Sequence, residues 1–62
     1  MIDTNSLVNM KEALAKEAII SKGYKVRIRS RDGRGMMGDA RPDNSRVNLH
    51  IDDGIVIKTS IG

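Results

Sequence analysis

The chain has to close a hydrophobic core almost without aromatic side chains, because it has no Phe, no Trp and a single tyrosine, Tyr24. It is 62 residues long, and a domain of that size buries only about 60% of the surface that its unfolded chain exposes. It has no Cys, so neither a disulfide nor a thiolate-bound metal ion can supplement the core. We therefore expect one marginally stable domain over residues 1–62 and, since association is the common remedy, a homo-oligomer.

Charge and hydropathy indicate the compartment and the kind of partner that the chain is expected to have. Lys and Arg number 11 against 8 Asp and Glu, which gives a net charge of +3. No apolar run approaches the ~20 residues of a membrane span, and no signal-like segment opens the chain. With the absence of Cys, these features predict a cytoplasmic protein that binds no membrane. Arginines gather in the middle third, at Arg27, Arg29, Arg31, Arg34, Arg41 and Arg46. They indicate either an anionic partner or a solvated basic face.

Residues 5–22 are predicted to form a helix. Apolar residues recur there at steps of three and four, at Leu7, Met10, Leu14, Ala15, Ala18 and Ile19. This spacing places them on one helix face. The start is open between Thr4 and Lys11, because several residues there have capping side chains. Gly23 is a typical C-terminal stop.

Strands are predicted at residues 24–31, 46–51 and 55–61, where apolar and polar residues alternate. A two-residue turn at Asp53-Gly54 would join the last two strands and pair Ile51 with Val56. A three-residue turn over 52–54 would instead pair Ile51 with Ile55 and continue the apolar face. We favour the second register because it keeps that face intact.

The segment 32–45 between the first two strands has no periodicity and holds three glycines and one proline. A loop of this length is unusual in so small a domain, and such loops tend to carry function. The sequence therefore predicts an α+β fold in which one helix packs on a small mixed sheet of about three strands. The long exposed loop between the first two strands is the predicted binding loop.

Several groups of residues follow one another at a characteristic spacing: Leu7-Val8, Ala15-Lys16 with Ile19, Arg41-Pro42-Asp43, Arg46-Val47-Asn48-Leu49 and Ile61-Gly62. In order and spacing they resemble the helix, the binding-loop exit, the central strand and the closing valine-glycine of the potato inhibitor I family. This family of serine protease inhibitors includes the eglins and the barley chymotrypsin inhibitors. The resemblance covers residues 7–62, and bacterial relatives with an Arg-Pro-Asp-Arg loop exit are the most similar. It implies a potato-inhibitor-I-like fold.

The resemblance also implies a function and its residues. The protease-contact loop would consist of Met36, Met37, Gly38 and Asp39. Met37 would enter the specificity pocket of a subtilisin-like or chymotrypsin-like serine protease, and Arg41 and Arg46 would brace the loop. A rigid loop of this kind binds as a substrate does, because preorganisation removes the ordering cost of association. Asn48 stands where many members have a second bracing arginine.

A function of a different class is also open. If Arg27, Arg29 and Arg31 project from one face of their strand beside Arg46 and His50, the sheet presents a cationic surface. Guanidinium groups bind phosphate through two parallel hydrogen bonds. Two such surfaces in an oligomer would form a pocket that sequesters an anionic, nucleotide-like small molecule. Extended nucleic acid suits the chain less, because the charge excess is small and stacking aromatics are missing.

No catalytic or metal-binding motif can be assembled. His50 is the only histidine, and no second ligand or triad partner is evident near it in the sequence. Asp52-Asp53-Gly54 lacks the alternating oxygen ligands of a calcium loop and is typical of a turn. We therefore expect a binding protein that is not an enzyme and uses no cofactor, with a serine protease or an anionic small molecule as partner.

Overall fold

The structure is a computed structural model that describes residues 2–36 and 41–62. Its elements are the 3-10 helix η1 (Thr4–Leu7), the helix α1 (Glu12–Ser21) and the strands β1 (Lys25–Arg31), β2 (Arg34–Gly35), β3 (Arg46–Asp52) and β4 (Ile55–Ile61). The strand order is β2-β1-β3-β4, with β1 and β3 parallel and the other neighbours antiparallel. The predicted α+β fold, a helix on a mixed sheet, is confirmed. The described sheet has four strands instead of three.

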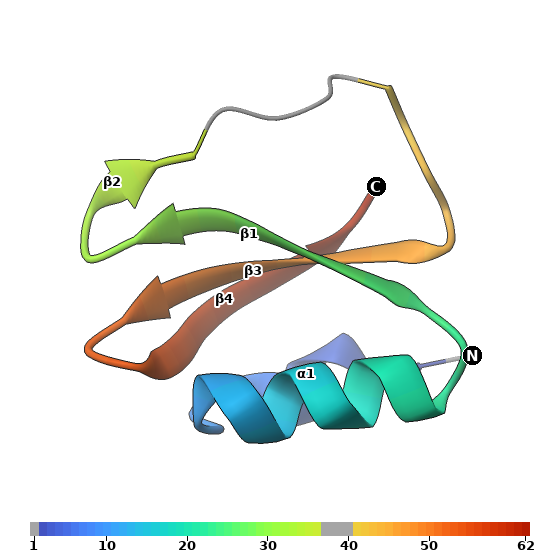
Figure 1. The fold of residues 1–62 in the computed structure, drawn as a ribbon, viewed down its shortest axis with the longest axis horizontal. Helices are drawn as coiled ribbons and strands as arrows, with labels where there is room; N and C mark the ends of the chain where they lie inside the picture. Colours follow the sequence, from blue (N-terminus) through green and yellow to red (C-terminus); the bar gives the residue numbers. More distant parts are fainter. Residues whose placement is uncertain (1, 37–40) are drawn as a thin grey trace.

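Figure 1 shows α1 on one side of β1, β3 and β4, whereas residues 41–45 and the chain end after β4 lie on the other side. We call the sheet face toward α1 the helix face and the opposite one the open face. Among the described residues, α1 is the longer helix, and its 10 residues are about half of what a membrane span needs. No described helix could therefore span a membrane.

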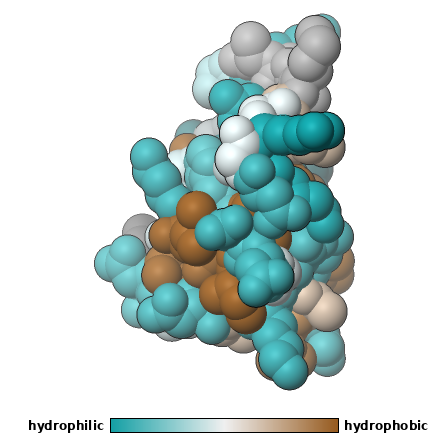
Figure 2. Space-filling view, turned by 90° about the vertical axis from the view of Figure 1, so that its left-hand side faces the viewer, coloured by the Kyte–Doolittle hydropathy of each residue, from teal (hydrophilic) through white to brown (hydrophobic). Residues whose placement is uncertain are grey.

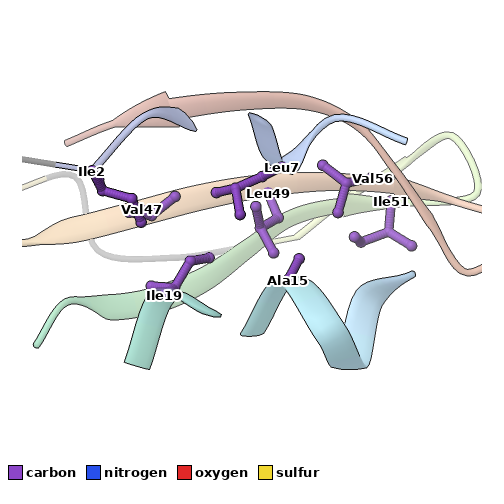
Figure 3. Packing of buried hydrophobic residues seen from close by; sticks show 8 residues of the cluster. All are labelled: Ile2, Leu7, Ala15, Ile19, Val47, Leu49, Ile51 and Val56. Atoms are coloured by element: carbon purple, nitrogen blue, oxygen red, sulfur yellow. The ribbon is translucent and has the colours of Figure 1, made fainter. Parts of the chain in front are cut away.

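The core lies between α1, η1 and the helix face of the sheet (Figure 3). Its buried residues are Ile2, Leu7, Ala15, Ile19, Val47, Leu49, Ile51 and Val56. Val47, Leu49 and Ile51 alternate along β3, as the period of a strand requires. The expectation that Leu14 faces this core is wrong, because its side chain is 53% exposed. The buried stripe of α1 is centred on Ala15 and Ile19, and Leu14 lies about 100° away from Ala15 around the helix.

The predicted helix over 5–22 is divided, and α1 begins only at Glu12. Asn9 has a left-handed backbone with φ 77°, which an α-helix does not allow. Its N–H donates to the main-chain oxygen of Val56 at 2.8 Å, and the N–H of Val56 donates to Met10 at 2.9 Å. Pairing with the first part of β4 thus satisfies main-chain groups that a continuous helix would have used internally.

A two-residue turn closes the β3–β4 hairpin, so the three-residue register favoured from the sequence is wrong. Ile51 lies opposite Val56, and Asp53 and Gly54 have φ values of 51° and 75°. Two consecutive left-handed residues are the signature of a type I′ turn, whose twist matches that of the strands. A register shift follows between His50 and Ile51, and it leaves Ile57 as the extra residue of β4. The apolar face is thus restored by a bulge and not by a longer turn.

A second hairpin lies inside the segment that was predicted to be all loop. Arg31 is opposite Arg34, and Asp32 and Gly33 between them have φ values of 52° and 80°. This is the same Asp-Gly turn that closes β3–β4. The turn and β2 thus account for residues 32–35 of the segment that is predicted to be a loop.

Candidate functional site

The guanidinium group of Arg46 joins the exit of the predicted binding loop to the end of β4. Its Nη2 donates to the main-chain oxygen of Arg41 at 2.6 Å, and its Nε donates to the main-chain oxygen of Gly62 at 2.9 Å. The donors of a guanidinium group have fixed directions in one plane, so two bonds of this kind also fix its orientation. Hydrogen bonds from a charged donor are stronger than neutral ones. Arg46 thus holds Arg41 at a set position over the open face.

Asn48 extends this arrangement across the sheet. Its side chain is buried, with 5% exposed. The Nδ2 atom donates to the main-chain oxygen of Gly62 at 3.1 Å, and Oδ1 accepts from Nε of Arg27 at 2.9 Å. Nδ2 also donates to Oγ of Ser60 at 3.3 Å. Asn48 therefore reaches the same Gly62 oxygen as Arg46 does.

These contacts form one hydrogen-bonded chain from β1 to the loop exit. We call it the bracing network, and its members are Arg27, Asn48, Gly62, Arg46 and Arg41. The resemblance predicts a bracing role for Arg46, and the alternative anion-binding surface includes both Arg27 and Arg46. Asn48 had no assigned role, although alternation along β3 already placed it on the same sheet face as Arg46.

The turn before β3 is held by the carboxylate of Asp43. Its Oδ1 accepts from the main-chain N–H of Ser45 at 2.9 Å and from the Ser45 hydroxyl at 2.6 Å. Its Oδ2 lies 3.1 Å from Nζ of Lys25. The Ser45 hydroxyl, then the Ser45 N–H and then Lys25 hold the pKa of Asp43 far below its usual range. Aspartate turns of this type stabilise a local chain reversal. The segment from Arg41 to Arg46 is therefore held both by the Asp43 turn and by the hydrogen bond from Arg46 to Arg41.

The entrance of the predicted loop is attached to β1. The N–H of Met36 donates to the main-chain oxygen of Arg29 at 2.8 Å, and its side chain is exposed. The predicted contact residues Met37, Gly38 and Asp39 lie outside the described residues. The structure therefore describes the two flanks of the predicted contact segment.

The predicted arginine surface is not assembled as expected. The register of β1 against β3 shifts between Ile28 and Ser30, so Arg29 is an extra residue that inverts the alternation after it. Arg31 consequently lies opposite Ile51, toward the helix face. Its Nη2 lies 2.9 Å from Oε2 of Glu12 in α1. Arg27 lies on the open face and bonds to Asn48, whereas Arg31 points to the other face and pairs with Glu12. The arrangement in which Arg27, Arg29 and Arg31 all project beside Arg46 and His50 is therefore not found.

Glu12 pairs with two cations at the edge of the helix layer. Besides Arg31, its Oε2 lies 3.0 Å from Nζ of Lys16, one turn later in α1. The hydrogen bond from Lys16 lowers the pKa of Glu12 most, and Arg31 adds to this effect. The role of Arg31 in the described structure is thus to join the sheet to the helix.

The same bulge brings Ser30 to His50 on the open face, a pair that sequence reasoning missed. The Ser30 Oγ and His50 Nδ1 atoms are 2.9 Å apart, and Lys58 is the cross-strand neighbour of His50. A nucleophilic triad needs a third group that orients the imidazole, and no bond from a carboxylate to His50 is found in residues 2–36 and 41–62. In the same residues no cluster of three His, Cys, Asp or Glu side chains could hold a metal ion.

Comparisons of the chain with protein-family models, with curated proteins and with solved structures find no match. A functional assignment therefore depends on the geometry of this chain, on the bracing network in particular, and on the resemblance in the loop-exit and strand motifs.

Proposed function

We propose that the chain inhibits a serine protease of the subtilisin-like or chymotrypsin-like class, and that its protease-contacting segment consists of Met36, Met37, Gly38 and Asp39. The observation that carries the proposal is the double hydrogen bond of Arg46 to the main-chain oxygens of Arg41 and Gly62. An inhibitor of this kind differs from a substrate in that its contact segment is ordered before binding. Arg46 supplies such order at the exit of the segment.

Attachment of both flanks supports the same proposal. At the entrance, Met36 bonds to Arg29 and β2 pairs with β1. At the exit, Arg41 bonds to Arg46, and the Asp43 turn follows. Fixing both ends of a short segment lowers the entropy that it loses when a partner orders it.

The methionines of the segment favour a target protease whose specificity pocket is apolar. Met36 and Met37 have long, flexible and polarisable side chains that adapt to apolar surfaces. A chymotrypsin-like protease has a hydrophobic slot at this position, whereas a trypsin-like pocket carries a carboxylate that selects a cation. We assign Met37 as the specificity residue of the proposed inhibitor.

The anion-sequestering alternative has less support. Arg31 is paired with Glu12, and Arg27 and Arg46 donate to protein groups within the bracing network. A phosphate would have to compete with these internal acceptors, so we propose no second function.

The test is inhibition of subtilisin and of chymotrypsin by the purified chain and three variants. Met37→Gly should weaken inhibition by emptying the specificity pocket, and Arg46→Ala should weaken it by releasing Arg41. Arg29→Gln is the matched control, because Arg29 is exposed and lies outside the bracing network, so it should inhibit like the natural chain. Rapid cleavage between Met36 and Arg41 with no loss of protease activity would show that the segment is only a substrate.

A further inference from the structure

The outer edge of β4 has unused main-chain hydrogen-bonding groups. The N–H of Gly62 donates to the main-chain oxygen of Arg46 at 3.0 Å, which makes this a hydrogen-bonded pair of the antiparallel ladder. Such pairs alternate with pairs whose N–H and C=O groups point away from the neighbouring strand. Thr59 and Ile61 occupy these alternate positions. Among the described residues, neither has a main-chain hydrogen bond to any segment outside the sheet.

The same stretch exposes apolar side chains. Residues 9–12 cover the first part of β4 and the turn before it, at Gly54, Ile55 and Val56. Beyond that point the hydroxyl of Thr59 donates to the main-chain oxygen of Thr4 at 3.2 Å, and the neighbouring isoleucines stay exposed, Ile57 by 54% and Ile61 by 44%. Figure 2 views the side of the molecule on which the two hairpin turns lie in Figure 1, and hydrophobic surface is visible there between hydrophilic residues. An open strand edge with apolar side chains is a template for pairing with another strand.

We propose that β4 pairs antiparallel with β4 of a second copy about a two-fold axis at Thr59, so that two sheets join into one. This register places the outward groups of Thr59 opposite those of the other Thr59. It sets Ile57 of each copy opposite Ile61 of the other, so both exposed isoleucines gain an apolar neighbour. A C2 interface requires this kind of self-complementarity. The proposal does not rest on the proposed protease inhibition.

Charge selects this register over its neighbour. With the axis at Thr59, Lys58 of each copy lies opposite Ser60 of the other. Moving the axis by one residue, to Lys58, would set two ammonium groups directly opposite each other, which destabilises a strand pair. It would also oppose residues whose main-chain groups already bond to β3.

A small apolar pocket adjoins the proposed interface. It has a volume of about 250 Å³ and is lined by Ile2, Thr4, Tyr24, Asn44 and Ile61. Because Ile61 is both a pocket wall and an edge residue, the proposed register brings Ile57 of the second copy to the pocket rim. Covering this rim would bury apolar surface that a core without Phe or Trp leaves exposed.

The test is size-exclusion chromatography with light scattering on a dilution series of the full chain. The natural chain should give twice its mass of 6.8 kDa at high concentration and dissociate on dilution. Ile57→Lys and Ile61→Lys should each raise the dissociation constant by about tenfold or more, because each acts at both symmetry-related pairs. Ile20→Lys is the matched control, since Ile20 is an exposed isoleucine of α1 and should leave the dimer unchanged.

Amide hydrogen exchange gives a second measurement that does not depend on a variant. The amides of Thr59 and Ile61 should exchange more slowly as the concentration rises, whereas the amide of Ser60, which faces β3, should not change. A natural chain that stays monomeric at every concentration would overturn the proposal. A dimer in which Ile20→Lys dissociates the copies, or in which Thr59 gains no protection, would overturn it as well.

Discussion

Nη2 of Arg46 donates to the main-chain oxygen of Arg41 at 2.6 Å, across a turn that contains Pro42 and the Asp43 carboxylate. The bond spans the exit of the proposed contact segment and is made by the first residue of β3. The same guanidinium group is anchored on Gly62, and Gly62 is held in turn by Asn48. A substitution of Arg46 should therefore release the exit of the proposed contact segment from the open face of the sheet.

Replacing Arg46 with alanine removes both of its side-chain hydrogen bonds. Hydrogen bonds to charged groups contribute about 1.5–3 kcal/mol each, and because Arg46 is half-buried we expect the free energy of unfolding to fall by about 2 kcal/mol. Chemical denaturation measures this change. Arg46→Lys should recover only part of it, because one ammonium group cannot reproduce the planar geometry of the two bonds. An Arg46→Ala chain as stable as the natural one would show that these bonds add nothing in solution.

Truncating Leu49 to alanine should destabilise the domain by about 2–5 kcal/mol, because its side chain is fully buried between sheet and helix. Leu14→Ala makes the same chemical change at an exposed position and should alter stability by less than about 0.5 kcal/mol. Thermal unfolding of the two variants gives the comparison. Equal losses at the two positions would contradict the observed orientation of α1.

The type I′ turn makes Gly54 sensitive to substitution. At φ 75° an added Cβ would meet no neighbouring atom, so Gly54→Ala should cost stability through its backbone alone, by about 1 kcal/mol. Gly35→Ala also places its Cβ in open space but has no positive φ, so it should be close to neutral. Denaturation midpoints that shift equally in both variants would argue against a left-handed backbone at Gly54.

Strand periodicity and the distribution of the helix and sheet could be predicted from the sequence, whereas the faces on which several side chains lie could not. Alternation identified Val47, Leu49 and Ile51 as one buried face. Alternation gives the wrong face for Arg31, because the bulge at Arg29 reverses the side of the sheet to which the following side chains point. No residue type in the sequence marks the position of this bulge. The β1–β2 hairpin could have been found, since Asp32-Gly33 is the same turn signal as Asp53-Gly54.

The sequence does not predict where α1 begins, and it predicts only part of the bracing network. The interruption at Asn9 depends on main-chain pairing with Val56, which is a tertiary contact that local propensity does not encode. Arg46 was assigned from the resemblance, and the structure shows it bonded to Arg41. The sequence predicts no bracing role for Asn48, because its partners Arg27 and Gly62 lie far from it along the chain.

The Asp43 turn should make stability depend on pH. Because hydrogen bonds from Ser45 and the charge of Lys25 lower the pKa of Asp43 in the folded state, its contribution is fully present above the unfolded pKa of about 4. It is lost as the pH falls below that value toward the folded pKa. Asp43→Asn should therefore lose stability at neutral pH and show a smaller further loss in acid. Unfolding of both chains at several pH values between neutral and acidic measures this; parallel curves would contradict it.

Inhibition by the proposed contact segment can be measured by titrating chymotrypsin or subtilisin with the natural chain and then recording mass spectra of the mixture. A braced segment should bind as a substrate does while its ends stay in place, so protease activity should fall to zero as the chain is added. The chain should remain intact at 6.8 kDa while Arg46→Ala is cut. Undiminished activity together with cleavage of the natural chain between Met36 and Arg41 would contradict the claim.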